Sequence, residues 1–148
     1  MKRILVGIDG SPRTAGVLAA ATTVARAQGG TITLVRAIGL PPEVPANFWK
    51  TTDEPLLVVL ERHAKEYLDE QAIQLPKELV GERLVVVGVP WQGICEAAHR
   101  IDAELIVIGS HGYAGIDRLL GTTAAKVVNH ANCSVLVVRD PHAAPPAA

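Results

Sequence analysis

Short apolar runs recur at intervals along the chain, and each of them predicts a strand. The runs are rich in branched residues and too short for helices, which is the pattern of strands buried on both faces of a sheet. The predicted strands are residues 3–8, 31–38, 84–87, 105–108 and 135–138.

Between these runs, apolar residues recur at helical spacing. The first predicted helix has Ser11 as its N-cap and Pro12 at its first position, and Gly29 ends it. Its buried stripe consists of Val17, Leu18, Ala21, Val24 and Ala25. The other predicted helices run from Asp53 to about Leu75, from Pro90 to about Ile101, and from about Thr122 to His130. Strands that alternate with helices predict one α/β domain, with a five-stranded parallel sheet and helices on both faces.

The composition is that of a folded protein without a preference for nucleic acid. Of the 148 residues, 49% are hydrophobic and 20% are charged, and the net charge is −1 with no basic block. Aromatic residues make up 3%, which is too few for a platform on which bases stack. No apolar run approaches the roughly 20 residues that cross a bilayer, and the N-terminus lacks a signal-peptide pattern. We therefore expect a cytoplasmic protein that binds neither nucleic acid nor membrane.

Residues that often bind metals or act as nucleophiles show no suitable spacing. Cys95 and Cys133 are the only cysteines, so there is neither a disulfide framework nor a CxxC pair. We interpret both as small buried hydrophobic residues. No second histidine or cysteine stands at metal-ligand spacing from His63, His99, His130 or His142. A nucleophile with a base at matching spacing is also missing, so no catalytic residue is predicted.

A glycine-rich loop follows the fourth predicted strand and is the strongest candidate site. Glycines occupy positions 109, 112 and 115, and Gly121-Thr122-Thr123 opens the last helix. Glycine lets the backbone approach a ligand closely, and the first N–H groups of a helix favour an anion. The pattern predicts a phosphate site. The alternative is a loop that only turns, with a threonine as an ordinary helix cap.

Several stretches, taken together, resemble one known family. They are Ile-Leu-Val-Gly-Ile-Asp9-Gly-Ser11, Val87-Gly-Val-Pro90, Gly109-Ser-His-Gly112 followed by Arg-Leu-Leu-Gly121-Thr122, and Asn-Cys-Ser-Val-Leu-Val-Val-Arg139. In this order they are similar to the ATP-binding members of the universal stress protein family, over residues 2–139. One difference lies in the loop, where Tyr113 to Leu120 make eight residues and the family's pattern has nine.

The resemblance implies the adenine nucleotide alpha hydrolase-like fold, a doubly wound sheet with strand order 3-2-1-4-5. Its universal stress protein domain would span residues 1–139, and we expect residues 140–148 to be a disordered tail. In that order the first and fourth strands are neighbours, and the chain winds in opposite directions on either side of them. Ligands of such sheets bind where these strands end. Asp9 and Gly109, which follow the two strands, should therefore lie close together.

The resemblance also implies the residues that bind the nucleotide. They are Asp9, Ala37, Ile108, Gly109, His111, Gly112, Arg118, Gly121, Thr122 and Thr123. Asp9 would accept hydrogen bonds from ribose hydroxyls, with a turn that it closes on its own backbone as the alternative. Ala37 would contact adenine through its backbone. The glycines, His111, Arg118 and the two threonines would hold ribose and phosphates, although His111 could equally bond within the loop. Mg²⁺ would accompany ATP through the phosphates, close to Asp9.

The function implied is that of a regulatory protein of the stress response, which binds ATP or a related adenine nucleotide. It would act as a homodimer and signal to a protein partner that the sequence does not identify. The last strand, with Val135, Leu136, Val137 and Val138, would pair across the dimer axis, because an apolar edge strand requires a partner. A nucleotide-free dimeric interaction module is one alternative, which the short loop favours. A slow ATPase is the other, although the chain has no Gly-x-x-x-x-Gly-Lys-Ser/Thr loop.

Overall fold

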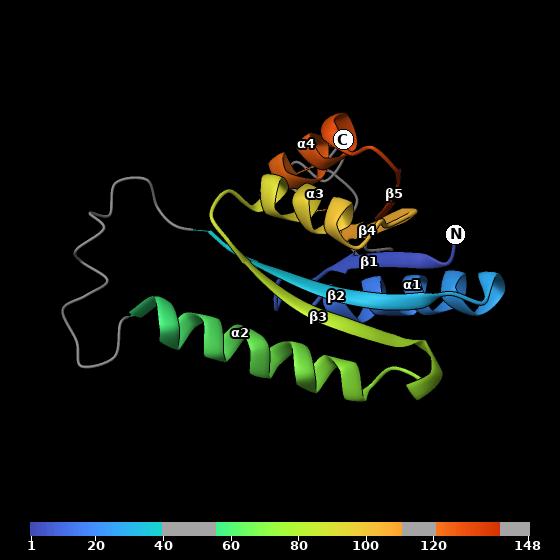
Figure 1. Ribbon diagram of the computed structural model, residues 1–148, viewed down its shortest axis with the longest axis horizontal. Helices are drawn as coiled ribbons and strands as arrows, with labels where there is room; N and C mark the ends of the chain where they lie inside the picture. Colours follow the sequence, from blue (N-terminus) through green and yellow to red (C-terminus); the bar gives the residue numbers. More distant parts are fainter. Residues whose placement is uncertain (40–55, 111–120, 140–148) are drawn as a thin grey trace, which may run out of the picture.

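Strands and helices alternate along the chain in the computed structural model, which describes residues 1–39, 56–110 and 121–139 (Figure 1). The elements are β1 (Arg3–Gly7), α1 (Thr14–Gln28), β2 (Thr31–Ile38), α2 (Leu56–Ile73), the 3₁₀ turn η2 (Lys77–Leu79), β3 (Val80–Val87), α3 (Pro90–Arg100), β4 (Leu105–Gly109), α4 (Thr122–His130) and β5 (Ser134–Val138). This order confirms the predicted α/β class.

The five strands form one parallel sheet in the order β3-β2-β1-β4-β5, as the resemblance implied. β1 lies at its centre, with Ile4 opposite Ile32 of β2 on one side and Leu105 of β4 on the other. From β1 the chain first builds the β2–β3 side of the sheet and then returns to build the β4–β5 side. The connections therefore diverge at the β1–β4 pair, which leaves a crevice at the carboxyl ends of these strands.

Two apolar cores, one on each face of the sheet, hold the helices in place. Figure 1 shows α1 and α2 on one face and α3 and α4 on the other. On the first face Ile4 packs in a cluster with Leu68 of α2. On the second face Leu5 packs in a cluster with Ile94 of α3 and Val127 of α4. Because successive residues of the central strands are buried on opposite faces, these strands read as continuous apolar runs.

β3 begins earlier than the sequence pattern indicated, at Val80 instead of Leu84. It is an edge strand, so only one side of its backbone pairs within the sheet. The side chain of Glu82 is exposed, and Arg83 forms an ion pair with Asp69 of α2, with 2.7 Å between Nε and Oδ1. An edge strand tolerates such polar residues. The first half of β3 therefore lacks the apolar run on which the prediction depended.

α2 ends at Ile73, before the predicted end near Leu75. The N–H groups of Gln74 and Leu75 donate to the carbonyl oxygens of Gln71 and Ala72, which closes a tight turn. The residue before a proline avoids the helical conformation, so a helix usually ends before it, here ahead of Pro76. Asp53, the predicted cap of α2, and the predicted tail 140–148 lie outside the described residues. Among the helices described, none is long and apolar enough to cross a membrane.

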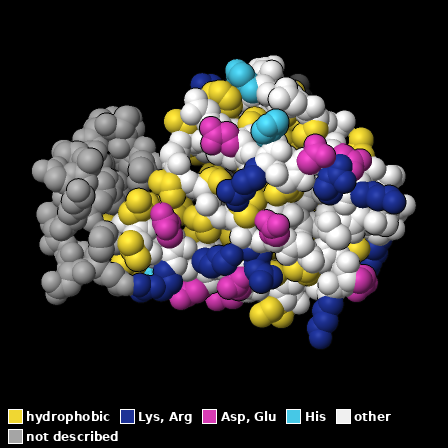
Figure 2. Space-filling model, in the orientation of Figure 1, with side chains coloured by type: hydrophobic (Ala, Val, Ile, Leu, Met, Phe, Trp, Pro, Cys, Tyr) yellow, Lys and Arg dark blue, Asp and Glu magenta, His cyan; other side chains and the backbone are white. Residues whose placement is uncertain are grey.

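Charged side chains of both signs are interspersed over the face that Figure 2 shows. Ion pairs also join neighbouring segments, as between Arg3 of β1 and Glu104 before β4, with 3.1 Å from Nη2 to Oε1. Exposed pairs of this kind contribute only about 0–1 kcal/mol each. The stability of the fold therefore depends mainly on the two apolar cores.

Candidate functional site

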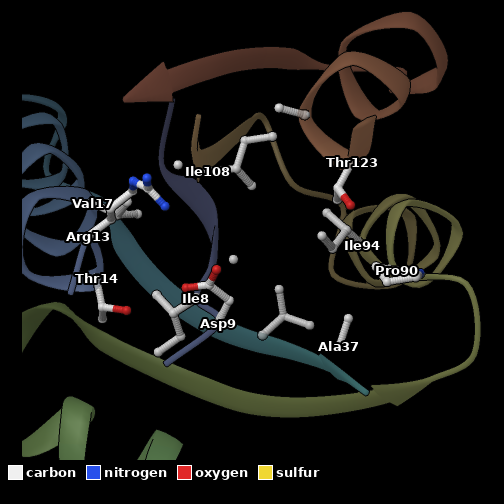
Figure 3. Close-up of a pocket in the computed structure, with 14 residues that line it drawn as sticks. Ile8, Asp9, Arg13, Thr14, Val17, Ala37, Pro90, Ile94, Ile108 and Thr123 are labelled. Atoms are coloured by element: carbon white, nitrogen blue, oxygen red, sulfur yellow. The ribbon is translucent and has the colours of Figure 1, made fainter. Parts of the chain in front are cut away.

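A cavity of about 190 Å³ lies at the carboxyl ends of β1, β2 and β4 (Figure 3). It occupies the crevice where the connections of the sheet diverge, which is the usual ligand position in such folds. Figure 3 shows Arg13, Thr14 and Val17 on the α1 side of the cavity. Pro90 and Ile94 of α3 and Thr123 of α4 lie on the opposite side. Six elements, which are spread along the sequence, thus contribute to one site.

The wall of the cavity is largely apolar. Val35 and Ile108 belong to β2 and β4, and their side chains are buried in the core that the sheet shares with α3 and α4. Ile94 of α3 belongs to the same core and lines the same cavity. Ala37, at the end of β2, adds only a methyl group and leaves the space open. An apolar wall of this kind suits a flat ring that has few hydrogen bonds to make on its faces.

The polar groups of the cavity come from the segment that joins β1 to α1 and from the start of α4. Asp9 and Arg13 are exposed, whereas Thr14 is 6% exposed. Asp9 supplies a carboxylate, which only accepts hydrogen bonds when ionised, and Arg13 supplies a cation that only donates them. Thr123 of α4 brings a hydroxyl from the other side. The cavity therefore combines an apolar wall with hydrogen-bonding groups of both kinds.

A compact turn places Asp9 at the cavity. The Ser11 N–H donates to Asp9 Oδ1 at 3.0 Å, and the Arg13 N–H donates to Ser11 Oγ at 3.2 Å. The Thr14 N–H then donates to the Ser11 carbonyl oxygen at 3.1 Å. Asp9 therefore does close a turn on its own backbone, which was the alternative prediction for this residue. Asp9 also lines the cavity.

This turn delays the start of the first helix. We predicted Ser11 as the N-cap and Pro12 as the first helical residue, but α1 begins at Thr14 and Arg13 occupies the N-cap position. The prediction was wrong about where the helix begins: Ser11 Oγ does accept the Arg13 N–H, as a capping serine would, but this bond lies in a separate turn ahead of Thr14. Ser11 thus shapes the loop at the site and does not cap the helix.

Gly10 lets this turn lie directly on the side chain of Arg36. Its φ of 79° is in the left-handed region, where a side chain costs about 1–2 kcal/mol. A Cβ atom at Gly10 would also lie 2.7 Å from Arg36 Nη1, too close for any real contact. A larger residue at position 10 would therefore strain the turn and displace the guanidinium group beneath it.

Gly10→Ala is expected to weaken the binding of the adenine nucleotide predicted for this site about 3- to 10-fold. This is the effect of one misplaced hydrogen bond at Asp9. The matched control is Gly29→Ala, because Gly29 has a similar φ of 64° but open space around its Cβ direction. Both variants should lose about 1–2 kcal/mol of unfolding free energy in urea, and only Gly10→Ala should lose affinity in calorimetric titrations. Equal affinity of the two variants would show that the turn does not position the site.

The comparisons with known proteins agree with this geometry. The sequence model of the Universal stress protein family matches residues 1–139. The chain belongs to the universal stress protein family. It is 32% identical over 140 residues to universal stress protein A homolog 1 of Coxiella burnetii (strain RSA 493 / Nine Mile phase I), which covers 93% of this chain and 95% of the relative.

Two solved structures of universal stress proteins carry ligands and share this fold. One is the universal stress protein from Archaeoglobus fulgidus in complex with dAMP, with 27% identity, a TM-score of 0.66 and coverage of 93% of this chain and 98% of that one. The other is a universal stress protein in complex with cAMP, with 27% identity, a TM-score of 0.60 and coverage of 93% and 96%. These likenesses confirm the predicted nucleotide-hydrolase-like fold for this universal stress protein.

Half of the residues predicted for nucleotide binding line the cavity. They are Asp9, Ala37, Ile108, Gly109 and Thr123. Gly121 is buried and Thr122 is exposed at the start of α4, and neither lines the cavity. His111, Gly112 and Arg118 lie outside the described residues, so their roles stay predictions.

The first turn of α4 does not have the threonine cap that was the alternative to a phosphate site. Gly121 is the N-cap, with φ −59° and ψ 159°, and as a glycine it makes no side-chain capping hydrogen bond. Both threonines stand inside the helix, at its first two positions. The hydroxyl of Thr123 is thus not used as the N-cap, and the residue lines the cavity instead.

Sequence reasoning missed several residues that line the cavity, among them Arg13, Thr14, Val17, Pro90 and Ile94. Arg13 and Thr14 follow Asp9 within the same short segment, and this proximity was an available signal. Ile94 was assigned to the inner face of its helix, which is correct because it is buried. The pattern of a buried residue does not reveal that one of its sides borders a cavity.

Cys95 and Cys133 lie away from this cavity and border a second, smaller one of about 110 Å³ between α3 and the end of α4. Both are free thiols, half-buried instead of fully buried as predicted, and they pack against the core beneath α3 and α4. Burial raises the pKa of both thiols, and the proximity of Cys133 adds to the rise in the pKa of Cys95. The thiols therefore stay protonated at neutral pH, as small apolar groups do.

Proposed function

We propose that this universal stress protein binds an adenine nucleotide, ATP foremost, in the cavity at the carboxyl ends of β1, β2 and β4. The observation that carries the proposal is the convergence of Asp9, Ala37, Ile108, Gly109 and Thr123 on one cavity. These residues come from distant parts of the sequence and were predicted from the family's nucleotide-binding pattern. The protein would act in the cytoplasm as a regulatory homodimer of the stress response, and not as a dedicated enzyme.

The cavity suits the nucleoside part of the ligand. Its volume of about 190 Å³ is smaller than the roughly 300–1,000 Å³ of pockets that enclose a whole drug-sized ligand. We infer that adenine lies against Val35, Ile94 and Ile108, with its edge near the backbone of Ala37. The carboxylate of Asp9 would accept hydrogen bonds from the ribose hydroxyls.

The phosphates would extend from the cavity toward the start of α4. The first N–H groups of α4, which follow Gly121, and the dipole of the helix favour negative charge there. Thr123 would add a hydroxyl, and Arg13 would provide positive charge from the opposite side. His111, Gly112 and Arg118 would complete the phosphate site as the family's pattern implies, and Mg²⁺ would bind through the phosphate oxygens with Asp9 nearby.

The proposal is tested with the purified protein by calorimetric titration with ATP and Mg²⁺, repeated with ADP and AMP. Mass spectrometry of the denatured protein first determines whether a nucleotide has remained bound during purification. We expect a dissociation constant on the order of micromolar, or a co-purified adenine nucleotide. No heat with any of the three nucleotides and no retained nucleotide would overturn the proposal and favour a nucleotide-free interaction module.

The homodimer would form through β5. This strand pairs only with β4 in the described sheet, and Leu136 is exposed at this edge. An unpaired edge with an exposed apolar side chain tends to associate with another strand. A second copy of the chain, related by a twofold axis, would supply that strand.

A further inference from the structure

Thr14 combines two properties that are rare among the polar residues of the structure. Its side chain is 6% exposed, and it still lines the cavity. Thr33, the other buried polar residue within the described ranges, does not line it. A buried hydroxyl group is costly unless it makes hydrogen bonds. The position of Thr14 therefore needs a reason in terms of hydrogen-bonding partners.

One hydrogen-bonding partner of Thr14 lies on α2, beside the core that α1 and α2 share with the sheet. The hydroxyl of Tyr67, on α2, donates to Thr14 Oγ1 at 3.1 Å. The two residues are 53 positions apart in sequence. No residue of α2 lines the cavity within the described part of the chain, so Tyr67 connects α2 to the site through its hydrogen bond to Thr14.

Two contacts hold the ring of Tyr67 in place. The guanidinium group of Arg36, in β2, lies over the ring with 4.9 Å from Cζ to the ring centre. This is within the range of a cation–π contact. The ring also packs against the apolar core beneath α1 and α2. The direction from which the Tyr67 hydroxyl reaches Thr14 is therefore determined by packing.

The bond from Tyr67 decides what Thr14 can offer a ligand. A threonine hydroxyl has one proton to donate and two lone pairs that accept. Since Tyr67 donates to Thr14, it occupies a lone pair and leaves the Thr14 proton for another acceptor. Within the described residues, the bond from Tyr67 is the hydrogen bond that the Thr14 hydroxyl makes. Thr14 therefore faces the cavity as a donor.

Asp9 has the opposite character at the same cavity. Its ionised carboxylate only accepts hydrogen bonds, and it stands at the end of β1, one short turn before Thr14. A group that both donates and accepts would satisfy the two residues together. Among the parts of a nucleotide, a ribose hydroxyl is such a group, whereas the ring nitrogens of adenine only accept.

We propose that Thr14 is a specificity-determining residue, which donates its hydroxyl proton to a ribose hydroxyl oxygen while that hydroxyl donates to Asp9. Tyr67 is the positioning residue that keeps Thr14 in the donor role. This inference rests on the proposed function, because it needs a nucleotide in the cavity. It extends the site to α2, a helix that contributes nothing to the wall of the described cavity.

The test measures the affinities of ATP, 2′-deoxy-ATP and 3′-deoxy-ATP by calorimetry for the wild type and for Thr14→Val. The substitution replaces the hydroxyl with a methyl group of similar size. We expect it to weaken ATP binding about 3- to 10-fold, the usual effect of one hydrogen bond. We expect no loss for one of the two deoxy nucleotides, because that analogue lacks the hydroxyl that Thr14 contacts.

Two further variants separate positioning from packing. Thr14→Ser keeps the hydroxyl and should retain the wild-type preference among the three nucleotides. Tyr67→Phe keeps the ring and its contact with Arg36 and should weaken ATP binding about 2- to 3-fold. In the Thr14→Val background, Tyr67→Phe should have no additional effect on affinity, since the two changes act on one interaction.

The control is Thr33→Val, which makes the same change at a buried threonine outside the cavity. It should leave all three affinities unchanged. Wild-type affinity in Thr14→Val, or an equal loss for all three nucleotides, would overturn this inference and leave the proposed function standing. A wild type that binds no adenine nucleotide would overturn both.

Discussion

Ala37→Phe is expected to abolish adenine nucleotide binding while the protein remains folded. Ala37 lies at the carboxyl end of β2, opposite Val86 of β3, and it lines the cavity of about 190 Å³. A phenylalanine ring at this position would occupy the space proposed for the adenine base. We expect the affinity to fall more than about 100-fold, which corresponds to roughly 3 kcal/mol. Calorimetric titration with ATP and Mg²⁺ measures this loss directly.

The fold should tolerate this change because Ala37 is only half-buried and borders an open cavity. Two variants make the result interpretable. Ala37→Gly should keep the affinity within about 2-fold of the wild type, since the proposed contact with adenine uses the backbone. Ala27→Phe adds the same ring at an exposed position of α1 and should leave binding unchanged. A folded Ala37→Phe variant that binds ATP normally would place the base elsewhere.

Leu136→Asp is expected to convert the proposed homodimer into a monomer. Leu136 is 36% exposed on β5, at the edge of the described sheet. A twofold axis beside this strand would bring the two introduced carboxylates close together in an apolar interface. Charges on an edge strand prevent pairing with another strand, and like charges that lose water repel each other strongly. We expect the dimer dissociation constant to rise more than about 100-fold, which sedimentation equilibrium would detect.

Ile73→Asp is the matched control for this prediction. Ile73 is 84% exposed at the end of α2, a helix that packs beside β2 and β3 at the far edge of the sheet from β5. The same change there should leave the dimer intact. A dimer that persists in Leu136→Asp, or a wild type that sediments as a monomer, would refute the β5 interface. A dimer lost only in Ile73→Asp would place the interface at α2.

The strands that the sequence predicted best, β5 among them, are those with an uninterrupted apolar run. β1, β2 and β4 appeared within a residue or so of their predicted bounds, because burial on both faces requires an uninterrupted apolar run. β3 was predicted only in its second half. Its first half lies at an exposed edge, where Glu82 and Arg83 contact solvent and α2 without any apolar pattern. Local patterns thus detect an apolar run, which the edge strand β5 also has, and they fail where polar residues interrupt the run, as in the first half of β3.

The start of α1 shows a second limit of local patterns. Ser11 and Pro12 are both common residues at the start of a helix, and their order in the sequence favoured that interpretation. In the structure the carboxylate of Asp9 accepts the Ser11 N–H and stabilises a separate turn. The competition between a turn and a helix start is decided by where the chain must go after β1. The turn after β1 lies against the side chain of Arg36 in β2, which is far away in the sequence.

The sequence by itself determined the fold class, the family and five of the residues that line the cavity, because apolar periodicity and short motifs are local properties. The tertiary structure decided which of these residues meet. Asp9, Ala37, Ile108 and Thr123 converge because parallel strands in the order β3-β2-β1-β4-β5 end at one edge. Only the structure brings Tyr67 to Thr14, since a hydrogen bond across 53 positions leaves no periodic trace in the sequence.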